Sequence, residues 1–446
     1  MEEHVYQSPG KSVISQIFKT LHQYFPSLKT HLASLPDSRR RKQYSTQELA
    51  MAGVCMFMLK EGSRNAFNND RKDPVFRANY QSVFGLDLPH LDTVDDYFRD
   101  LATSCLEEVK ASLIRDLLRK KVLQPHKYRG CYIVAIDGTG VSTYSHKHCE
   151  YCLHKKSGSG VVTWSHNVLE AKLLTPTGLS LSIATEWISN EGRANYQKQD
   201  CEQAAFKRLS IKIKKMFPRL PIIIIADGLY PTQGFFDICK RNNWHYVVTL
   251  KDGNLRLLQE EIALERRLVP NQKGESIAFH KDHRTKLLCH WLSGLEYKTH
   301  MLNWVECNEE VSVKNQGVIK GQRFVHITDM ELSNTLCVGV SQTGRLRQKI
   351  ENEGFNDQKN QGYALEHKFS RVSFPAMKNY YQCLQIAHII NQLVQASQEI
   401  RGLIKARLKC TVKYLWKRLM SYMLEVLVDR TELLILTQNR FQIRLE

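Results

Sequence analysis

Two Asp-Gly pairs in the sequence each follow directly on a short, strongly apolar run. Asp137 comes after residues 132–136 (Tyr-Ile-Val-Ala-Ile), and Asp227 comes after residues 222–226 (Ile-Ile-Ile-Ile-Ala). Runs of this length and composition predict strands that are buried on both faces. Because ligands collect at the carboxyl ends of strands in open α/β sheets, we expect both aspartates to face one cleft.

Two carboxylates held close together repel each other unless a hard cation lies between them. Mg²⁺ or Mn²⁺, which prefer oxygen ligands, meet that need. A pair of such ions can activate a water or a 3′-hydroxyl and stabilise the leaving oxygen of a phosphodiester. Either Asp-Gly pair alone is more simply explained as a turn. Its repetition after two buried strands favours Asp137 and Asp227 as catalytic, metal-binding residues.

The segments around the two aspartates predict the order β-β-β-α-β-α-β. Besides the two apolar strands, the pattern indicates strands at residues 163–174, 179–187 and 244–250 and helices at residues 199–217 and 232–241. A three-stranded meander followed by alternating helices and central strands is the order of an RNase H-like core. We therefore expect an α/β fold with an RNase H-like catalytic core.

The rest of the chain is expected to surround this core with helical regions and one insertion. Residues 1–125 predict a helical, basic N-terminal region for DNA binding or assembly, and residues 126–251 the first part of the core. Residues 252–343 alternate in hydropathy and predict a β-rich insertion. Residues 344–400 predict helices that complete the core, and residues 401–446 predict a basic helical tail.

A third metal ligand is expected on a helix beyond the insertion, and residues 345–359 form a charged helical segment there. Its Arg347-x3-Glu351 pair, together with Ala-Ile-Asp137-Gly-Thr and Ala-Asp227-Gly-Leu-Tyr, resembles the DDE transposases of bacterial insertion sequences. More narrowly, the chain resembles the group with a β insertion before the glutamate and a Tyr-x2-Arg-x3-Glu-x6-Lys signature. Matching features lie within residues 132–369 and include the segments 198–202 (Lys-Gln-Asp-Cys-Glu) and 362–367 (Gly-Tyr-x2-Glu-His).

Residue by residue, the resemblance implies that Glu351 is the third catalytic carboxylate and metal ligand. It also implies that Arg347 and Lys359 bind DNA phosphates. Two signature positions differ in this chain, since the Tyr position is a glycine and the Lys position is a glutamine, one residue before Lys359. Because of that shift, Glu353 stays open as the alternative third ligand.

The resemblance also implies an activity, a cofactor and partners. An enzyme of this family uses Mg²⁺ or Mn²⁺ to cut DNA at the ends of its own element and to join the 3′-hydroxyl to target DNA. It would bind terminal repeats and target DNA as a homodimer, in the cytoplasm and at the nucleoid of a bacterium. Two alternatives stay open: a catalytically inactive DNA-binding protein derived from such an enzyme, and an RNase H-like metal-dependent nuclease without joining activity.

Cysteines and histidines cluster shortly after Asp137. Cys149-x2-Cys152 has the spacing of half a zinc site, and His148 and His166 could complete a tetrahedron. A structural Zn²⁺ would rigidify a loop that is too polar to pack by itself. A polar loop that contacts DNA explains the same residues without a metal.

The composition of the 446-residue chain favours a nucleic-acid partner. Lys and Arg number 63 against 45 acidic residues, a formal net charge of +18, which attracts polyanions. The longest apolar runs are far shorter than the roughly 20 residues that cross a bilayer. The first residues are polar, so we expect neither a membrane span nor secretion. The twelve cysteines are mostly isolated, which predicts reduced thiols, and the lack of a Gly-x-Ser-x-Gly motif disfavours a serine hydrolase.

Overall fold

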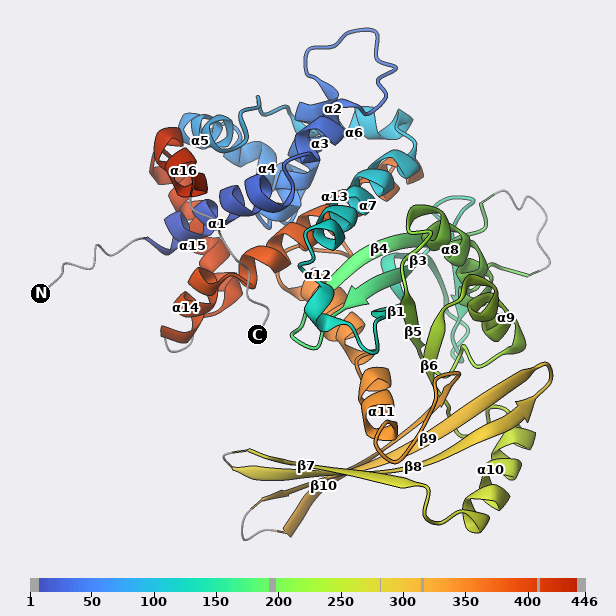
Figure 1. The fold of residues 1–446 in the computed structure, drawn as a ribbon. Helices are drawn as coiled ribbons and strands as arrows, with labels where there is room; N and C mark the ends of the chain where they lie inside the picture. Colours follow the sequence, from blue (N-terminus) through green and yellow to red (C-terminus); the bar gives the residue numbers. More distant parts are fainter. Residues whose placement is uncertain (1–7, 192–197, 281, 314–316, 407–409, 439–446) are drawn as a thin grey trace, which may run out of the picture.

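The computed structural model describes residues 8–191, 198–280, 282–313, 317–406 and 410–438 of the chain. In these residues a body of helices lies beside a long, mixed sheet (Figure 1). The α/β class that the sequence predicts is confirmed. Residues 1–7, 407–409 and 439–446 of the predicted terminal regions lie outside the described residues. Within the described ranges no helix is both long and apolar enough to cross a membrane.

The helices that precede the sheet account for most of the first 120 residues. The start of one of them shows how the local sequence sets a boundary, because Ser45 and Glu48 form a capping box. The carboxylate of Glu48 accepts a hydrogen bond from the backbone N–H of Ser45 at 2.7 Å. The helices are α1 (Pro9–Tyr24), α2 (Leu28–Ala33), α3 (Thr46–Met58), α4 (Arg64–Asp70), α5 (Pro74–Phe84), α6 (Leu91–Asp100) and α7 (Thr103–Arg119).

The helices at the end of the chain pack against those at its beginning, as the red and blue segments of Figure 1 show. α13 contacts α3, α6 and α7, and α1 contacts α15. The side-chain amide of Asn379 in α13 donates hydrogen bonds to the carbonyl oxygens of Phe98 and Leu101 at 2.9 and 2.7 Å. The two ends of the sequence therefore share one hydrophobic core. The late helices are α13 (Phe374–Gln395), α14 (Gln398–Ala406), α15 (Val412–Glu425) and α16 (Arg430–Gln438).

The central part of the sheet has the strand order β4-β3-β1-β5-β6. β3 runs antiparallel to both β1 and β4, whereas β1, β5 and β6 are parallel to one another. Parallel neighbours need a crossover, and α8 and α9 provide the two connections that the sequence predicts. The elements are β1 (Tyr132–Tyr144), β2 (Leu153–Lys156), β3 (Val162–Leu174), β4 (Ser180–Ile188), α8 (Glu202–Met216), β5 (Ile222–Ala226), α9 (Gln233–Asn242) and β6 (His245–Thr249).

β1 is longer than the sequence predicts. The apolar run was expected to end the strand just before Asp137, but β1 continues to Tyr144. Its parallel pairing with β5 ends at Ala135, and beyond that point β1 is paired with β3. Gly138 therefore lies inside a strand rather than in a turn. The local sequence does not reveal this, because the hydrogen-bond partners come from residues about thirty positions later in the chain.

The predicted β-rich insertion is a set of long strands that extends the same sheet. β10 pairs antiparallel with β6 and continues the sheet through β9 and β8 to β7. A helix, α10, precedes these strands and was not predicted, since no side chain caps its start to mark it in the sequence. The elements are α10 (Arg256–Leu268), β7 (Lys273–Phe279), β8 (His283–Tyr297), β9 (His300–Val313) and β10 (Gly317–Thr328).

The helix expected at residues 344–359 is broken into pieces. α11 (Cys337–Arg345) is followed by a π-helical segment, η2 (Ile350–Asn356), and then by α12 (Asp357–Asn360). π-helical turns often occur at functional sites. Gly344, which stands at the Tyr position of the transposase signature, packs against β10. A Cβ there would lie 2.6 Å from the ring of His326, so a larger side chain does not fit.

Candidate active site

Asp137 lies near the middle of β1 with its carboxylate partly exposed. Its Oδ1 accepts a hydrogen bond from the backbone N–H of Gly138 at 3.0 Å. Its Oδ2 forms an ion pair with Nη1 of Arg347 at 2.9 Å. Arg347 follows α11, so this contact joins the segment that carries the predicted third carboxylate to the central strand of the sheet.

Asp227 directly follows the last residue of β5, as the sequence predicts. Its Oδ1 accepts a hydrogen bond from the backbone N–H of Leu229 at 2.8 Å, and its Oδ2 pairs with Nζ of Lys251 at 2.8 Å. The aliphatic part of Lys251 crosses Gly228, where a Cβ would lie 2.5 Å from Cγ of the lysine. No motif in the sequence marks Lys251, which lies just after β6.

The two aspartates lie close together because their strands are neighbours in matching register. Ala135 of β1 pairs with Ile225 of β5, so two further residues along each strand bring Asp137 level with Asp227. Neighbouring strands are about 4.8 Å apart. Burial raises the pKa of Asp137 most, and the negative charges of Asp227 and Glu351 raise it further, against the opposing effect of Arg347. Crowded carboxylates of this kind favour a bound cation.

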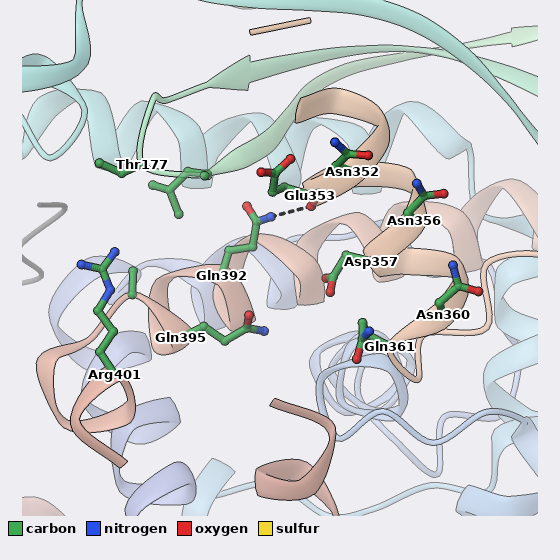
Figure 2. A pocket seen from close by; sticks show the side chains of 13 residues that line it. Thr177, Asn352, Glu353, Asn356, Asp357, Asn360, Gln361, Gln392, Gln395 and Arg401 are labelled. Atoms are coloured by element: carbon green, nitrogen blue, oxygen red, sulfur yellow. Dashed lines mark hydrogen bonds between the residues drawn. The ribbon is translucent and has the colours of Figure 1, made fainter. Parts of the chain in front are cut away.

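Of the two glutamates that the sequence offers as a third ligand, Glu351 lies on the side of the aspartates. Its charge contributes to the raised pKa of Asp137, and its side chain is exposed. Glu353 instead pairs with Nζ of Lys349 at 3.0 Å and lines a separate polar cavity of 380 Å³. In that cavity Gln392 donates a hydrogen bond to the carbonyl oxygen of Glu353 (Figure 2). Glu351 is therefore the better placed of the two, because its charge acts on Asp137 whereas Glu353 is paired with Lys349 and lines the other cavity.

Glu202, the first residue of α8, is a fourth carboxylate at this site. Burial is the largest cause that raises its pKa, followed by the charges of Asp137 and Asp227. A Cβ on Gly138 would lie 2.7 Å from Oε1 of Glu202, so only glycine leaves room for this carboxylate. In the sequence, Glu202 is part of a segment that matches the transposase group. An acid in the first turn of a helix is equally explained by the helix dipole, so no role was assigned to it.

The predicted DNA contacts, Arg347 and Lys359, have different surroundings. Arg347 pairs with Asp137 at 2.9 Å, whereas Lys359 pairs with Glu366 at 2.9 Å. Beside the aspartates lies a cavity of 480 Å³ between β6, β10 and α11. We call it the basic cleft, and its cationic side chains are Lys251, Arg323, Arg345 and Arg347.

The predicted zinc ligands gather at the far end of β1 and form a cluster of their own. Cys149, Cys152 and His166 point their ligand atoms at one another. His148 lies outside this group, with Nε2 at 2.7 Å from the carbonyl oxygen of Arg371. The described cysteines are free thiols, as the sequence predicts.

No protein-family model matches this chain, and no curated protein sequence matches it at a significant level. The functional interpretation therefore depends on the geometry of the site and on the sequence motifs.

Proposed function

We propose that this chain is a DDE transposase with an RNase H-like core, which cuts DNA at the ends of its element and joins them to target DNA. The observation that carries the proposal is the pairing of β1 with β5 in a register that brings Asp137 level with Asp227, with Glu351 of η2 near enough for its charge to raise the pKa of Asp137. The strand order β4-β3-β1-β5-β6, in which β3 alone runs opposite to the other four strands, supports the RNase H-like fold.

The types of donor fit a divalent cation, although in the described residues no three of these carboxylates have oxygens that all lie within 4.8 Å of one another, so the side chains would have to draw together around the ion. The converging groups are carboxylates, which are the ligands that Mg²⁺ and Mn²⁺ prefer, and Glu202 adds a fourth. Bound at this site, such an ion would stabilise charge on the phosphate and lower the pKa of the attacking water or 3′-hydroxyl. The protein's own part is to hold the carboxylates in place. Arg347 fixes Oδ2 of Asp137, and the backbone N–H of Leu229 fixes Oδ1 of Asp227.

The basic cleft gives the site a surface for the DNA backbone. The side chains of Lys251 and Arg323 are 58% and 51% exposed, and they pair with Asp227 and Glu306 at 2.8 Å each. Arg345 and Arg347 are less exposed and pair with Glu309 and Asp137 at 2.8 and 2.9 Å. We therefore assign phosphate binding to the two exposed cations and positioning of Asp137 to Arg347. The proposed partners are the terminal repeats, target DNA and a second copy of the chain.

The proposal is tested by incubating the protein with Mg²⁺ and DNA that carries the ends of its element next to flanking sequence. Wild-type protein should release the ends and join them to a second DNA. Asp137→Asn and Asp227→Asn should still bind the ends but cut neither strand, whereas Asp87→Asn, at an exposed aspartate among the N-terminal helices, should behave as wild type. Cleavage that persists in both active-site variants contradicts the proposal. Cleavage without joining by wild-type protein would instead identify a nuclease.

A further inference from the structure

A second group of side chains that can hold a metal lies at the end of β1 away from the core. Cys149 and Cys152 belong to the connection between β1 and β2, and His166 belongs to β3. The two Sγ atoms are 3.6 Å apart, and they lie 3.4 and 3.5 Å from Nε2 of His166. Among the residues that the structure describes, these are the one set of three or more His, Cys, Asp or Glu residues whose ligand atoms all lie within 4.8 Å of one another.

These distances are those of three corners of a tetrahedral zinc site. Zn–S bonds of about 2.3 Å and Zn–N bonds of about 2.0–2.1 Å, at tetrahedral angles, place two sulfurs about 3.8 Å apart and a sulfur and a nitrogen about 3.5 Å apart. A disulfide would require an S–S distance of about 2.05 Å, so the two sulfurs are not bonded to each other. The observed separations match the metal site within a few tenths of an ångström.

The surroundings hold these atoms in place. The backbone N–H groups of Tyr151 and Cys152 hydrogen bond to the sulfur of Cys149 and so orient it. The ring of His166 stacks on Phe374 at 4.6 Å and meets the edge of Tyr144 at 6.0 Å, so its Nε2 is directed at the sulfurs. The ligand atoms are therefore ordered by the fold and not only by their nearness in sequence.

His148 can supply the fourth ligand if its side chain moves, because its nitrogen atoms lie outside the group formed by the other three residues. Its ring stacks on Tyr144 at 4.1 Å, and the same tyrosine meets the ring of His166 at 6.0 Å, so both imidazoles pack against one side chain. Nε2 of His148 lies 2.7 Å from the carbonyl oxygen of Arg371, which leaves Nδ1 for a metal. A metal-bound histidine usually donates its other N–H to a carbonyl or carboxylate oxygen in this way.

We propose that the protein binds one structural Zn²⁺ through Cys149, Cys152, Nε2 of His166 and Nδ1 of His148. Binding forms two Zn–S and two Zn–N bonds and releases the two thiol protons to solvent. The ion joins the β1–β2 connection to β3 and so fixes the base of the β2–β3 hairpin, which carries the exposed side chains of Lys155 and Lys156. This site is separate from the carboxylates, and the proposal does not depend on the catalytic function.

The first test measures metal in the full-length protein, purified under reducing conditions and reconstituted with Zn²⁺. We expect about one zinc per chain, and Co²⁺ in its place should give the visible absorption of a tetrahedral site with thiolate-to-metal charge transfer. Cys149→Ser should abolish both signals, and His148→Ala should keep the charge transfer but change the visible bands. Cys201→Ser, at an exposed cysteine elsewhere, is the matched control and should retain the metal.

A second measurement needs no substitution and holds even if the variants fail to fold. In wild-type protein loaded with zinc, the partly exposed Cys149 should resist alkylation, and a chelator should make it reactive, whereas Cys201 should react in both states. The chelator should also speed tryptic cleavage after Lys155 and Lys156. Reconstituted protein without bound zinc, or Cys149 that is equally reactive with and without the chelator, would overturn the proposal.

Discussion

Gly138→Ala isolates the contribution of Glu202 to the candidate active site. Gly138 lies within β1 and does not have a positive φ, so the backbone accepts alanine, which is better than glycine in a strand interior by about 0.5–1 kcal/mol. The new Cβ would lie 2.7 Å from Oε1 and 3.0 Å from Cδ of Glu202. The alanine methyl therefore leaves the fold intact and displaces the carboxylate.

The size of the effect follows from this geometry. Ordinary contact between a Cβ and an oxygen needs at least several tenths of an ångström more than 2.7 Å, so the carboxylate must shift by a sizeable part of an ångström. Misplacing a catalytic group by about 1 Å costs about 10²-fold in rate. We expect Gly138→Ala to slow DNA cleavage by about 10- to 100-fold without lowering the melting temperature. Gly140→Ala is the matched control, since its nearest neighbour, Oδ1 of Asn167, would be 3.7 Å from the Cβ.

The assay is single-turnover cleavage of end DNA by four proteins: wild type, Gly138→Ala, Glu202→Ala and the double variant. If Gly138→Ala slows cleavage by displacing Glu202, it should not slow cleavage further in the Glu202→Ala background. The effects of the two substitutions on the cleavage rate should then be strongly non-additive. Equal slowing by Gly138→Ala in both backgrounds would refute the reasoning. So would a fully active Gly138→Ala variant.

Three further predictions concern other parts of the site. Glu351→Gln should reduce cleavage at least about 10²-fold, while Glu353→Gln, which changes a residue of the other cavity, should not, and the reverse result would make Glu353 the third ligand. Lys251→Ala should weaken DNA binding and lower the slope of log Kd against log salt by about one, and an unchanged slope would remove Lys251 from the DNA surface. The raised pKa of Asp137 means that its ionised form destabilises the fold. Asp137→Asn should therefore raise the melting temperature at neutral pH, with a gain that shrinks as the pH falls through the raised pKa of the folded state and is gone below the unfolded aspartate pKa of about 3.9. A variant that melts below wild type at pH 7 would contradict this.

The parts of the structure that the sequence predicts best are those whose signal is local. The apolar runs before Asp137 and Asp227 predict β1 and β5, and helical spacing predicts α8 and α9, because burial on one or both faces leaves a pattern within a few residues. The placement of the two aspartates on neighbouring strands follows from the predicted order of elements, although only Asp227 lies at the end of its strand.

The parts that the sequence does not predict depend on partners far along the chain. The continuation of β1 past Asp137 requires β3, and the joining of the insertion to the sheet requires the pairing of β10 with β6. The contact between Glu202 and Gly138 is also long-range, and it leaves no mark in either segment. The π-helical turn at η2 is a local feature, but it differs from an α-helix by too small a shift in spacing to be seen in the sequence.

The most direct test of the central claim compares cleavage of end DNA by wild-type protein, Asp137→Asn and Asp227→Asn in Mg²⁺ and in Mn²⁺, after DNA binding by all three has been shown to be equal. Because both carboxylates are proposed to hold the same cation site, we expect wild-type protein to cut with either ion. Each single variant should lose at least about 10³-fold in rate. Cleavage by either variant at a rate near that of wild type would contradict the assignment of Asp137 and Asp227 as the catalytic pair.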